Sequence, residues 1–199
     1  MKISLKILVS ALILFISTNT AKAFDFYAVN SDGDTICYNI IDYVNHTVDV
    51  TAGFSPYSDT INIPSSVYYG TNYTVTSIDN LAFAYCSNLI AVTIPNTVTS
   101  IGYSAFGGCT NLSSINIPNS VTSIGYWAFA ACSSLTSITI PSSVTNIGNG
   151  AFADATNLIT ITVNSSNANY SSSVDGVLYS KLQDTIFCCP CGKTGAFTI

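Results

Sequence analysis

Residues 132–152 read CSSLTSITIPSSVTNIGNGAF and contain no charged side chain. Near-copies occupy residues 109–129 and 86–106. Other positions recur with the same period of 23 residues: Ala-Phe at 82–83, 105–106, 128–129 and 151–152, Leu89/Leu112/Leu135/Leu158, and Val92/Ile115/Ile138/Ile161. A fixed period of this length is the sequence signature of a solenoid of stacked units.

Each unit predicts two short extended pieces and a turn. The segment LTSITIP, residues 135–141, alternates apolar and polar residues, which is typical of a half-buried strand. Pro141 ends this strand because it cannot donate to a ladder. Residues 143–148 predict a second extended piece with Gly148 as its turn, and residues 151–156 are too short for more than one helical or 3₁₀ turn. One unit cannot bury its own apolar side, so the units must stack at strand spacing, about 4.8 Å.

The N-terminal flank differs from the repeats. Residues 24–53 predict short strands joined at residues 31–34 and 43–46, which together form an N-terminal β cap. Residues 54–81 predict a variant first repeat, in which eight extra residues surround the sequence YYGTNY. Four regular units then follow over residues 82–173.

The C-terminal flank, residues 174–199, is a variant unit predicted as a hairpin that closes near residues 181–184. The chain stops at residues 197–199, where another Ile-Pro strand would begin. Either this hairpin is the cap of the solenoid, or the sequence is a truncated member of a longer protein, which we favour. The predicted fold class is therefore mostly β with short helical or 3₁₀ turns, arranged as a solenoid of 23-residue units between a β cap and a hairpin.

The first 23 residues predict a secretory signal peptide. Residues 1–6 are basic, residues 7–17 are apolar, and Ala-Lys-Ala at 21–23 is a cleavage signal. The apolar run is too short for a bilayer, which needs about 20 residues. The mature chain would begin at Phe24, contain no transmembrane segment and function extracellularly or at the cell surface.

The charge of this mature chain excludes one class of partner. It has no Arg and no Glu. Its two lysines, Lys181 and Lys193, and its ten aspartates give a net charge of −8. Such a protein lacks the cations that release counterions from phosphate backbones, so nucleic acid is not a partner. Residues 80–153 carry no charge at all, because a charge repeated in every unit would stack on its own copy.

The cysteines suggest a structural role. Cys86, Cys109 and Cys132 share one repeat position, which Ala155 fills in the next unit. A position that accepts Cys or Ala favours a small buried apolar group, so we expect free thiols, with stacked disulfides or a metal ladder as the alternatives. The remaining cysteines are Cys37 and the cluster Cys188, Cys189 and Cys191. A disulfide within this cluster, or between it and Cys37, is an alternative that the sequence leaves undecided. The spacing of the cluster matches no zinc-binding signature.

Few groups could perform catalysis. His46 is the single imidazole, and it reads as a turn residue of the N-terminal cap. Asp32 and Asp34 resemble a calcium loop only faintly, because no closing Glu is present, so a solvated turn is the better interpretation. The sequence predicts no enzyme, no cofactor and no metal site.

The columns L-x-x-I-x-I-P-x-x-V-x-x-I-G-x-x-A-F-x-x-C resemble the BspA-like, treponemal-type leucine-rich repeat family. Residues 82–173 supply four such units, and residues 54–81 are similar to the family's modified first unit. The resemblance implies a leucine-rich repeat solenoid. Members of this family are largely secreted or cell-surface proteins, and several are adhesins, so the resemblance also implies adhesion. It carries over no ligand-specific motif.

Outward-facing columns are the candidate binding residues. They are Thr93, Asn116, Thr139 and Thr162 on a flat, neutral, hydroxyl-rich strand face, and Tyr103 and Tyr126 stacked in one column with Trp127 beside them. Core-edge packing is the alternative for the tyrosines. An exposed aromatic group beside a polar ladder can anchor an uncharged interface. We therefore expect a secreted or surface binding protein, adhesin-like, with a protein or glycan partner; the alternative is a structural spacer of a longer surface protein.

Overall fold

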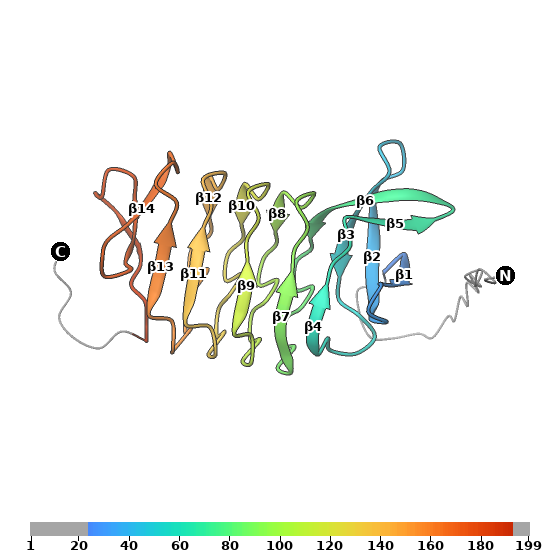
Figure 1. Cartoon of the computed structure of the whole chain (residues 1–199), viewed down its shortest axis with the longest axis horizontal. Helices are drawn as coiled ribbons and strands as arrows, with labels where there is room; N and C mark the ends of the chain where they lie inside the picture. Colours follow the sequence, from blue (N-terminus) through green and yellow to red (C-terminus); the bar gives the residue numbers. More distant parts are fainter. Residues whose placement is uncertain (1–23, 193–199) are drawn as a thin grey trace.

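The computed structural model describes residues 24–192, which form an elongated stack of short strands and turns (Figure 1). The predicted signal peptide, residues 1–23, and the end of the C-terminal unit, residues 193–199, lie outside the described residues. The predicted mostly β solenoid is confirmed, since residues 24–192 contain no helix and the units repeat every 23 residues. Accordingly, this part of the chain has no helix with the length and hydrophobicity to cross a membrane.

One side of the solenoid is made of parallel strands that come from successive units and lie side by side in Figure 1. Their register places Val92 beside Ile115 and Ile138 beside Ile161, which are the predicted apolar columns. The strands are β4 (Asp59–Asn62), β7 (Leu89–Thr93) and β9 (Ser114–Asn116) in one sheet, and β11 (Ser137–Ile140) and β13 (Thr160–Val163) in the next.

A second sheet runs along another side of the stack. It begins with the antiparallel strands of the N-terminal cap, which turn at residues 31–33 and 43–46 as the sequence predicts, and continues as parallel strands of the repeats. Its strands are β1 (Phe26–Val29), β2 (Thr35–Asp42), β3 (Thr47–Thr51), β6 (Thr71–Ile78), β8 (Ser100–Ile101), β10 (Ser123–Ile124) and β12 (Asn146–Ile147).

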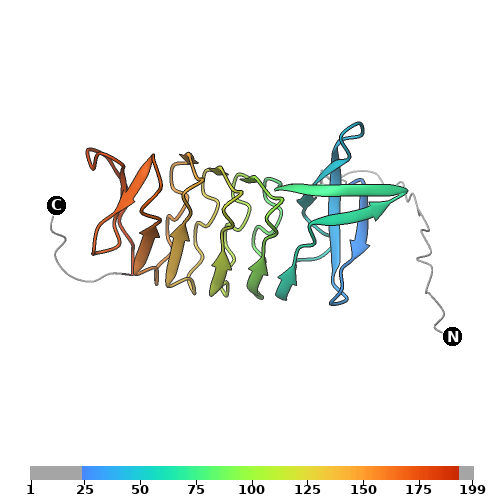
Figure 2. The ribbon, with the colours of Figure 1, turned by 45° about the horizontal axis from the view of Figure 1, so that its top comes forward.

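The extra residues of the first repeat form a hairpin of β5 (Ser66–Tyr69) with β6, which Figure 2 shows projecting over the cap. Its turn residue Gly70 has a left-handed backbone, with φ of 73°. At the other end, β14 (Tyr170–Ser172), β15 (Leu178–Ser180) and β16 (Ile186–Cys188) form an antiparallel sheet, whose β15–β16 turn contains the predicted residues 181–184.

The core consists of side-chain columns that run along the solenoid. The rings of Phe83, Phe106, Phe129 and Phe152 are buried and stack nearly parallel, with centroids 5.0, 5.3 and 5.8 Å apart. Burying a side chain of this size contributes about 1.5–3 kcal/mol relative to leaving it exposed. Each unit therefore depends on its neighbours for its stability.

The turns that carry the Ala-Phe pairs correct the prediction of helical or 3₁₀ turns. Each unit has two left-handed positions, which a right-handed helix cannot contain. Phe106 N–H donates to the carbonyl of Ala128 in the next unit at 2.8 Å, whereas Gly107 N–H donates to Ser104 within the turn at 3.0 Å. Backbone hydrogen bonds to the next unit thus alternate with bonds inside the turn, so the turn does not form a continuous helix. The left-handed residues are Leu81, Ser104, Trp127 and Gly150 in one column, and Tyr85, Gly108, Ala131 and Asp154 in the other.

The glycine column at 102, 125 and 148 also has a different role from the predicted one. Gly148 is not left-handed, and the left-handed turn residue is Gly150. A Cβ at Gly148 would lie 2.3 Å from the backbone nitrogen of Tyr126, and one at Gly125 would lie 2.5 Å from the carbonyl carbon of Gly102. Glycine is required here because the backbones of adjacent units touch.

The shared cysteine position holds free, buried thiols, as predicted. The Cys109 thiol donates to the carbonyl of Phe83 at 2.9 Å, and the Cys132 thiol donates to that of Phe106 at 3.2 Å. Burial raises the pKa of both thiols, that of Cys132 to about 12, so they stay protonated and unreactive at neutral pH. All seven cysteines lie within residues 24–192, and none of them forms a disulfide there.

We expect Gly125→Ala to lower the free energy of unfolding by about 1–3 kcal/mol, because the added methyl group would force two backbones apart. Urea unfolding measures this loss. Gly70→Asn is the matched control, since nothing lies within 4 Å of a Cβ there and Asn tolerates a left-handed backbone. A Gly125→Ala protein as stable as the parent would show that the spacing between units is not fixed by this contact.

We also expect the free energy of unfolding to fall as pH rises above about 9. Burial raises the pKa of the Cys86, Cys109 and Cys132 thiols above their ordinary value of 9.0, so the unfolded chain loses these protons before the folded one does. Their stabilising effect is complete below that value and is lost as pH rises towards the folded-state pKa values. Urea unfolding across the alkaline range measures the effect.

Cys109→Ala tests the origin of this pH dependence. It should cost about 1 kcal/mol at neutral pH, the usual cost of trimming a small buried group, because Ala155 already fills the same position. It should also make the alkaline loss of stability smaller. An unchanged pH dependence in this variant would assign the effect to other groups.

Candidate binding surface

The predicted strand residues lie exposed along one side of the stack. Thr93 pairs with Asn116 in register, and Thr139 pairs with Thr162. We call these four residues the strand row. Their neighbours in each strand, such as Ile138 and Ile161, point inward and are buried, so the alternation of the strand itself presents the polar groups. The side chains of the strand row form no hydrogen bond with another described residue, which leaves them available to a partner.

Threonines beside the second sheet behave differently. The hydroxyl groups of Thr99, Thr122 and Thr145 each donate to the backbone carbonyl of the threonine one unit earlier, all at 3.2 Å. These hydroxyl groups already have partners inside the solenoid. The two sides of the stack share a composition, but the hydroxyl groups of Thr99, Thr122 and Thr145 are bonded within the solenoid, whereas the side chains of the strand row have no hydrogen-bond partner among the described residues.

The predicted aromatic residues are also exposed rather than packed at the edge of the core. Tyr103, Tyr126 and Trp127 are 42%, 58% and 51% exposed. Tyr103 and Tyr126 occupy equivalent positions of adjacent units, yet the ring contact within the described residues joins Tyr103 and Trp127, with centroids 5.8 Å apart and planes at 43°. The Trp127 ring lies over Gly150 of the next unit, where a Cβ would come within 2.4 Å of its Cδ1.

The sequence interpretation missed Tyr85, which is 77% exposed and belongs to the second left-handed column. Its ring lies over Gly108, where a Cβ would come within 2.7 Å of the Tyr85 ring. The available signal was an aromatic residue followed 23 positions later by glycine, which Trp127 and Gly150 share. We call Tyr85, Tyr103, Tyr126 and Trp127 the aromatic group.

The strand row and the aromatic group lie on different parts of each unit. The strand row belongs to the sheets of β7 and β9 and of β11 and β13, whereas Tyr103 and Tyr126 follow β8 and β10 of the other sheet within two residues. The structure therefore brings Tyr103 and Trp127 together, and Thr139 and Thr162 together. Both surfaces carry little charge, because residues 80–153 contain none and Asp154 is the single charged residue between Tyr85 and Thr162.

The residues considered for catalysis or metal binding occupy turns. His46 lies in the β2–β3 turn, with its ring against Tyr73 at a centroid distance of 5.4 Å. Asp32 accepts a hydrogen bond from the Asn62 side chain, and Asp34 accepts one from Asn30 at 3.0 Å. Among residues 24–192, no three His, Cys, Asp or Glu side chains are grouped so that they could hold a metal ion.

Two of the similar solved structures, those from Bacteroides capillosus and Eubacterium ventriosum, support the repeat architecture. Three solved bacterial leucine-rich repeat proteins are similar: one from Bacteroides capillosus, 33% identical over 65% of this chain and 94% of that chain, with a TM-score of 0.55; one from Eubacterium ventriosum, 28% identical over 85% and 51%, with a TM-score of 0.54; and one from Bacteroides ovatus, 31% identical over 69% and 41%, with a TM-score of 0.49. The chain thus spans about half or less of the latter two proteins. No curated protein matches it.

The family itself follows from the repeats. Residues 76–189 match the BspA type leucine rich repeat region in six copies. This range contains the glycine, phenylalanine and cysteine columns that hold successive units together. The stacked 23-residue units and this match together show that the chain belongs to the BspA-type leucine-rich repeat family.

Proposed function

We propose that this protein is an exported, non-enzymatic binding protein, adhesin-like, that recognises a protein or glycan partner outside the cell or at its surface. The observation that carries the proposal is the strand row, whose polar side chains have no hydrogen-bond partner within the described residues. The half-exposed Tyr103–Trp127 pair supports it, because exposed aromatic side chains are the usual anchors of interfaces.

The physical basis is a neutral, preorganised surface. Water satisfies the hydroxyl and amide groups of the strand row in the free protein, and a partner with matching donors and acceptors would replace that water. The aromatic rings would add apolar area at a small entropic cost, because Trp127 already rests on Gly150 and Tyr103. Specificity would then come from shape and hydrogen bonding rather than from charge.

A structural spacer is the second candidate function. The elongated stack in Figure 1, held by hydrogen bonds from unit to unit, is suited to presenting another domain at a distance. Binding of the purified protein to immobilised extracellular matrix proteins, plasma proteins and microbial surfaces distinguishes the two. Saturable binding supports the adhesin-like function, and its absence on every surface would favour the spacer.

Trp127→Ala should weaken binding by at least about 2 kcal/mol, the loss expected for a buried aromatic anchor of an interface. The melting temperature should change little, because the ring is half exposed and the same column holds Ser104 and Gly150. Titrations monitored by surface plasmon resonance measure the affinity, which should respond little to added salt because no charge lies between residues 80 and 153.

Tyr68→Ala is the control for this prediction, since Tyr68 is 65% exposed but lies on the β5–β6 hairpin. It should leave binding unchanged. Unfolding of the Trp127→Ala protein would mean that the ring belongs to the core. Equal losses in both variants would mean that the aromatic group is not the anchor.

Thr139→Lys should reduce binding through the strand row, because it places a charge in a neutral interface that excludes water. Thr145→Lys adds the same charge beside β12 on the other sheet and should bind normally. The same titrations compare the two variants. If Thr145→Lys proves the more harmful of the two, the partner contacts the second sheet rather than the strand row.

A further inference from the structure

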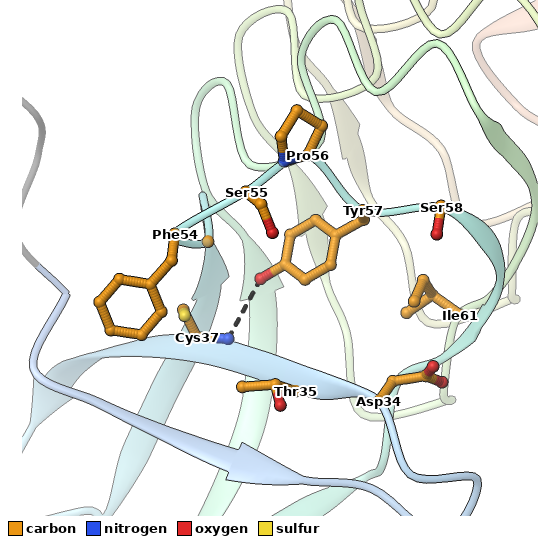
Figure 3. A pocket seen from close by; sticks show the side chains of 10 residues that line it. Asp34, Thr35, Cys37, Phe54, Ser55, Pro56, Tyr57, Ser58 and Ile61 are labelled. Atoms are coloured by element: carbon orange, nitrogen blue, oxygen red, sulfur yellow. Dashed lines mark hydrogen bonds between the residues drawn. The ribbon is translucent and has the colours of Figure 1, made fainter.

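A groove of about 200 Å³ lies where the N-terminal cap meets the first repeat, between the start of β2 and the loop from β3 to β4 (Figure 3). Its wall is rigid. The Tyr57 hydroxyl accepts the N–H of Cys37 at 3.1 Å and donates to the carbonyl of Thr51 at 2.9 Å, and Tyr57 N–H donates to the sulfur of Cys86 at 3.2 Å. These polar groups of Tyr57 therefore already have partners within the fold.

Phe54 stands at one end of the groove and is 76% exposed (Figure 3). Its ring meets Phe24 edge-on with centroids 4.5 Å apart, and it meets Tyr27 at 6.0 Å in a similar geometry. Two aromatic neighbours thus orient the Phe54 ring, which lies outside the hydrophobic core. An apolar ring fixed in this way offers its face to a ligand.

Asp34 lies at the other end, beside Ile61 (Figure 3). Its Oδ2 accepts the side-chain N–H of Asn30 at 3.0 Å, and its own N–H donates to Asn30 Oδ1 at 2.8 Å. The second carboxylate oxygen, Oδ1, forms no hydrogen bond or ion pair with any residue in the range 24–192. Cys37, near Phe54, is three strand residues from Asp34, so the groove is roughly 10 Å long.

Charge is strongly segregated along this protein. Residues 24–79 contain no Lys and no Arg but seven aspartates, namely Asp25, Asp32, Asp34, Asp42, Asp49, Asp59 and Asp79. The single lysine of the described residues, Lys181, lies in the C-terminal hairpin at the opposite end of the stack (Figure 1). The groove therefore lies in a negative field that no basic side chain of the cap offsets.

We propose that this groove binds a lysine or arginine side chain of a protein partner. The cationic group would meet the carboxylate of Asp34, and the methylene chain or a neighbouring apolar residue would pack against Phe54. A neutral glycan could use the same ring and hydroxyl groups but would gain nothing from the seven aspartates. The site is separate from the strand row and the aromatic group, and it does not depend on the function proposed for them.

The test uses a fluorescein-labelled peptide, Gly-Leu-Lys-Leu-Arg-Gly, and its counterpart with Gln in place of Lys and Arg. Fluorescence anisotropy should show binding of the basic peptide that weakens with salt, and little binding of the Gln peptide. Asp34→Asn and Phe54→Ala should each weaken binding at least about threefold. Asp154→Asn removes the same charge at the far end of the repeats, on a left-handed residue that Asn tolerates, and should have no effect.

Further measurements keep the proposal falsifiable. Amide chemical shifts in ¹⁵N spectra should change upon binding at residues 34–37, 53–55, 57 and 58. If Phe54→Ala proves unfolded by circular dichroism, Ser58→Lys, which adds a competing cation at the groove, should reduce binding instead. Trp127→Ala should bind the basic peptide normally, which separates this site from the repeat surface. Equal losses in Asp34→Asn and Asp154→Asn, or equal binding of the Gln peptide, would overturn the proposal.

Discussion

The contact of one unit's backbone with the next is the constraint on which the rest of this structure depends. At the glycine column the two chains approach so closely that a single methyl group would lie within 2.5 Å of the preceding backbone at Gly125. Backbone N–H groups in the turns then reach the carbonyl groups of the next unit, as Phe106 does with Ala128. This spacing also sets the stacking of the phenylalanine rings, whose centroids lie 5.0–5.8 Å apart.

Stacking of this kind places every side chain next to its own copy, and this explains the composition of the repeats. Like charges in a column would repel, and residues 80–153 contain none. A hydroxyl group can instead donate to the backbone of the preceding unit, as Thr122 does, and a small thiol can fill a buried position beside Phe83, as Cys109 does. Nine of the ten aspartates accordingly lie outside the four regular units, and Asp154 is the exception. Neutral repeat sides and an acidic cap are two consequences of the same constraint.

The ends of the stack require residues that the repeats do not supply. At the C-terminal end, the buried Asn167 side chain donates to the carbonyl groups of Pro141 and Val144 at 2.8 and 3.0 Å. The hydroxyl of Tyr170 accepts the N–H of Ile147 at 2.9 Å, where a further strand would otherwise pair. At the N-terminal end, β3 pairs in parallel with β6 and so connects the antiparallel cap to the repeats. These contacts satisfy backbone groups that a bare solenoid end would leave open.

The sequence by itself determined the period, the inward columns and the free thiols, because identical spacing and a position that accepts Cys or Ala can be read without coordinates. It also placed the candidate residues on exposed positions, since Thr139 alternates with buried Ile138 and Ile140. Only the tertiary structure decided the left-handed turns, the role of Gly148 in close approach, and the pairing of Tyr103 with Trp127. It also decided that Thr122 is bonded internally while Thr139 is not, and that Asp34 and Phe54 share a groove. These features depend on how one unit is offset from its neighbour, and a repeat period specifies which residues are adjacent but not the direction in which their backbones and side chains meet.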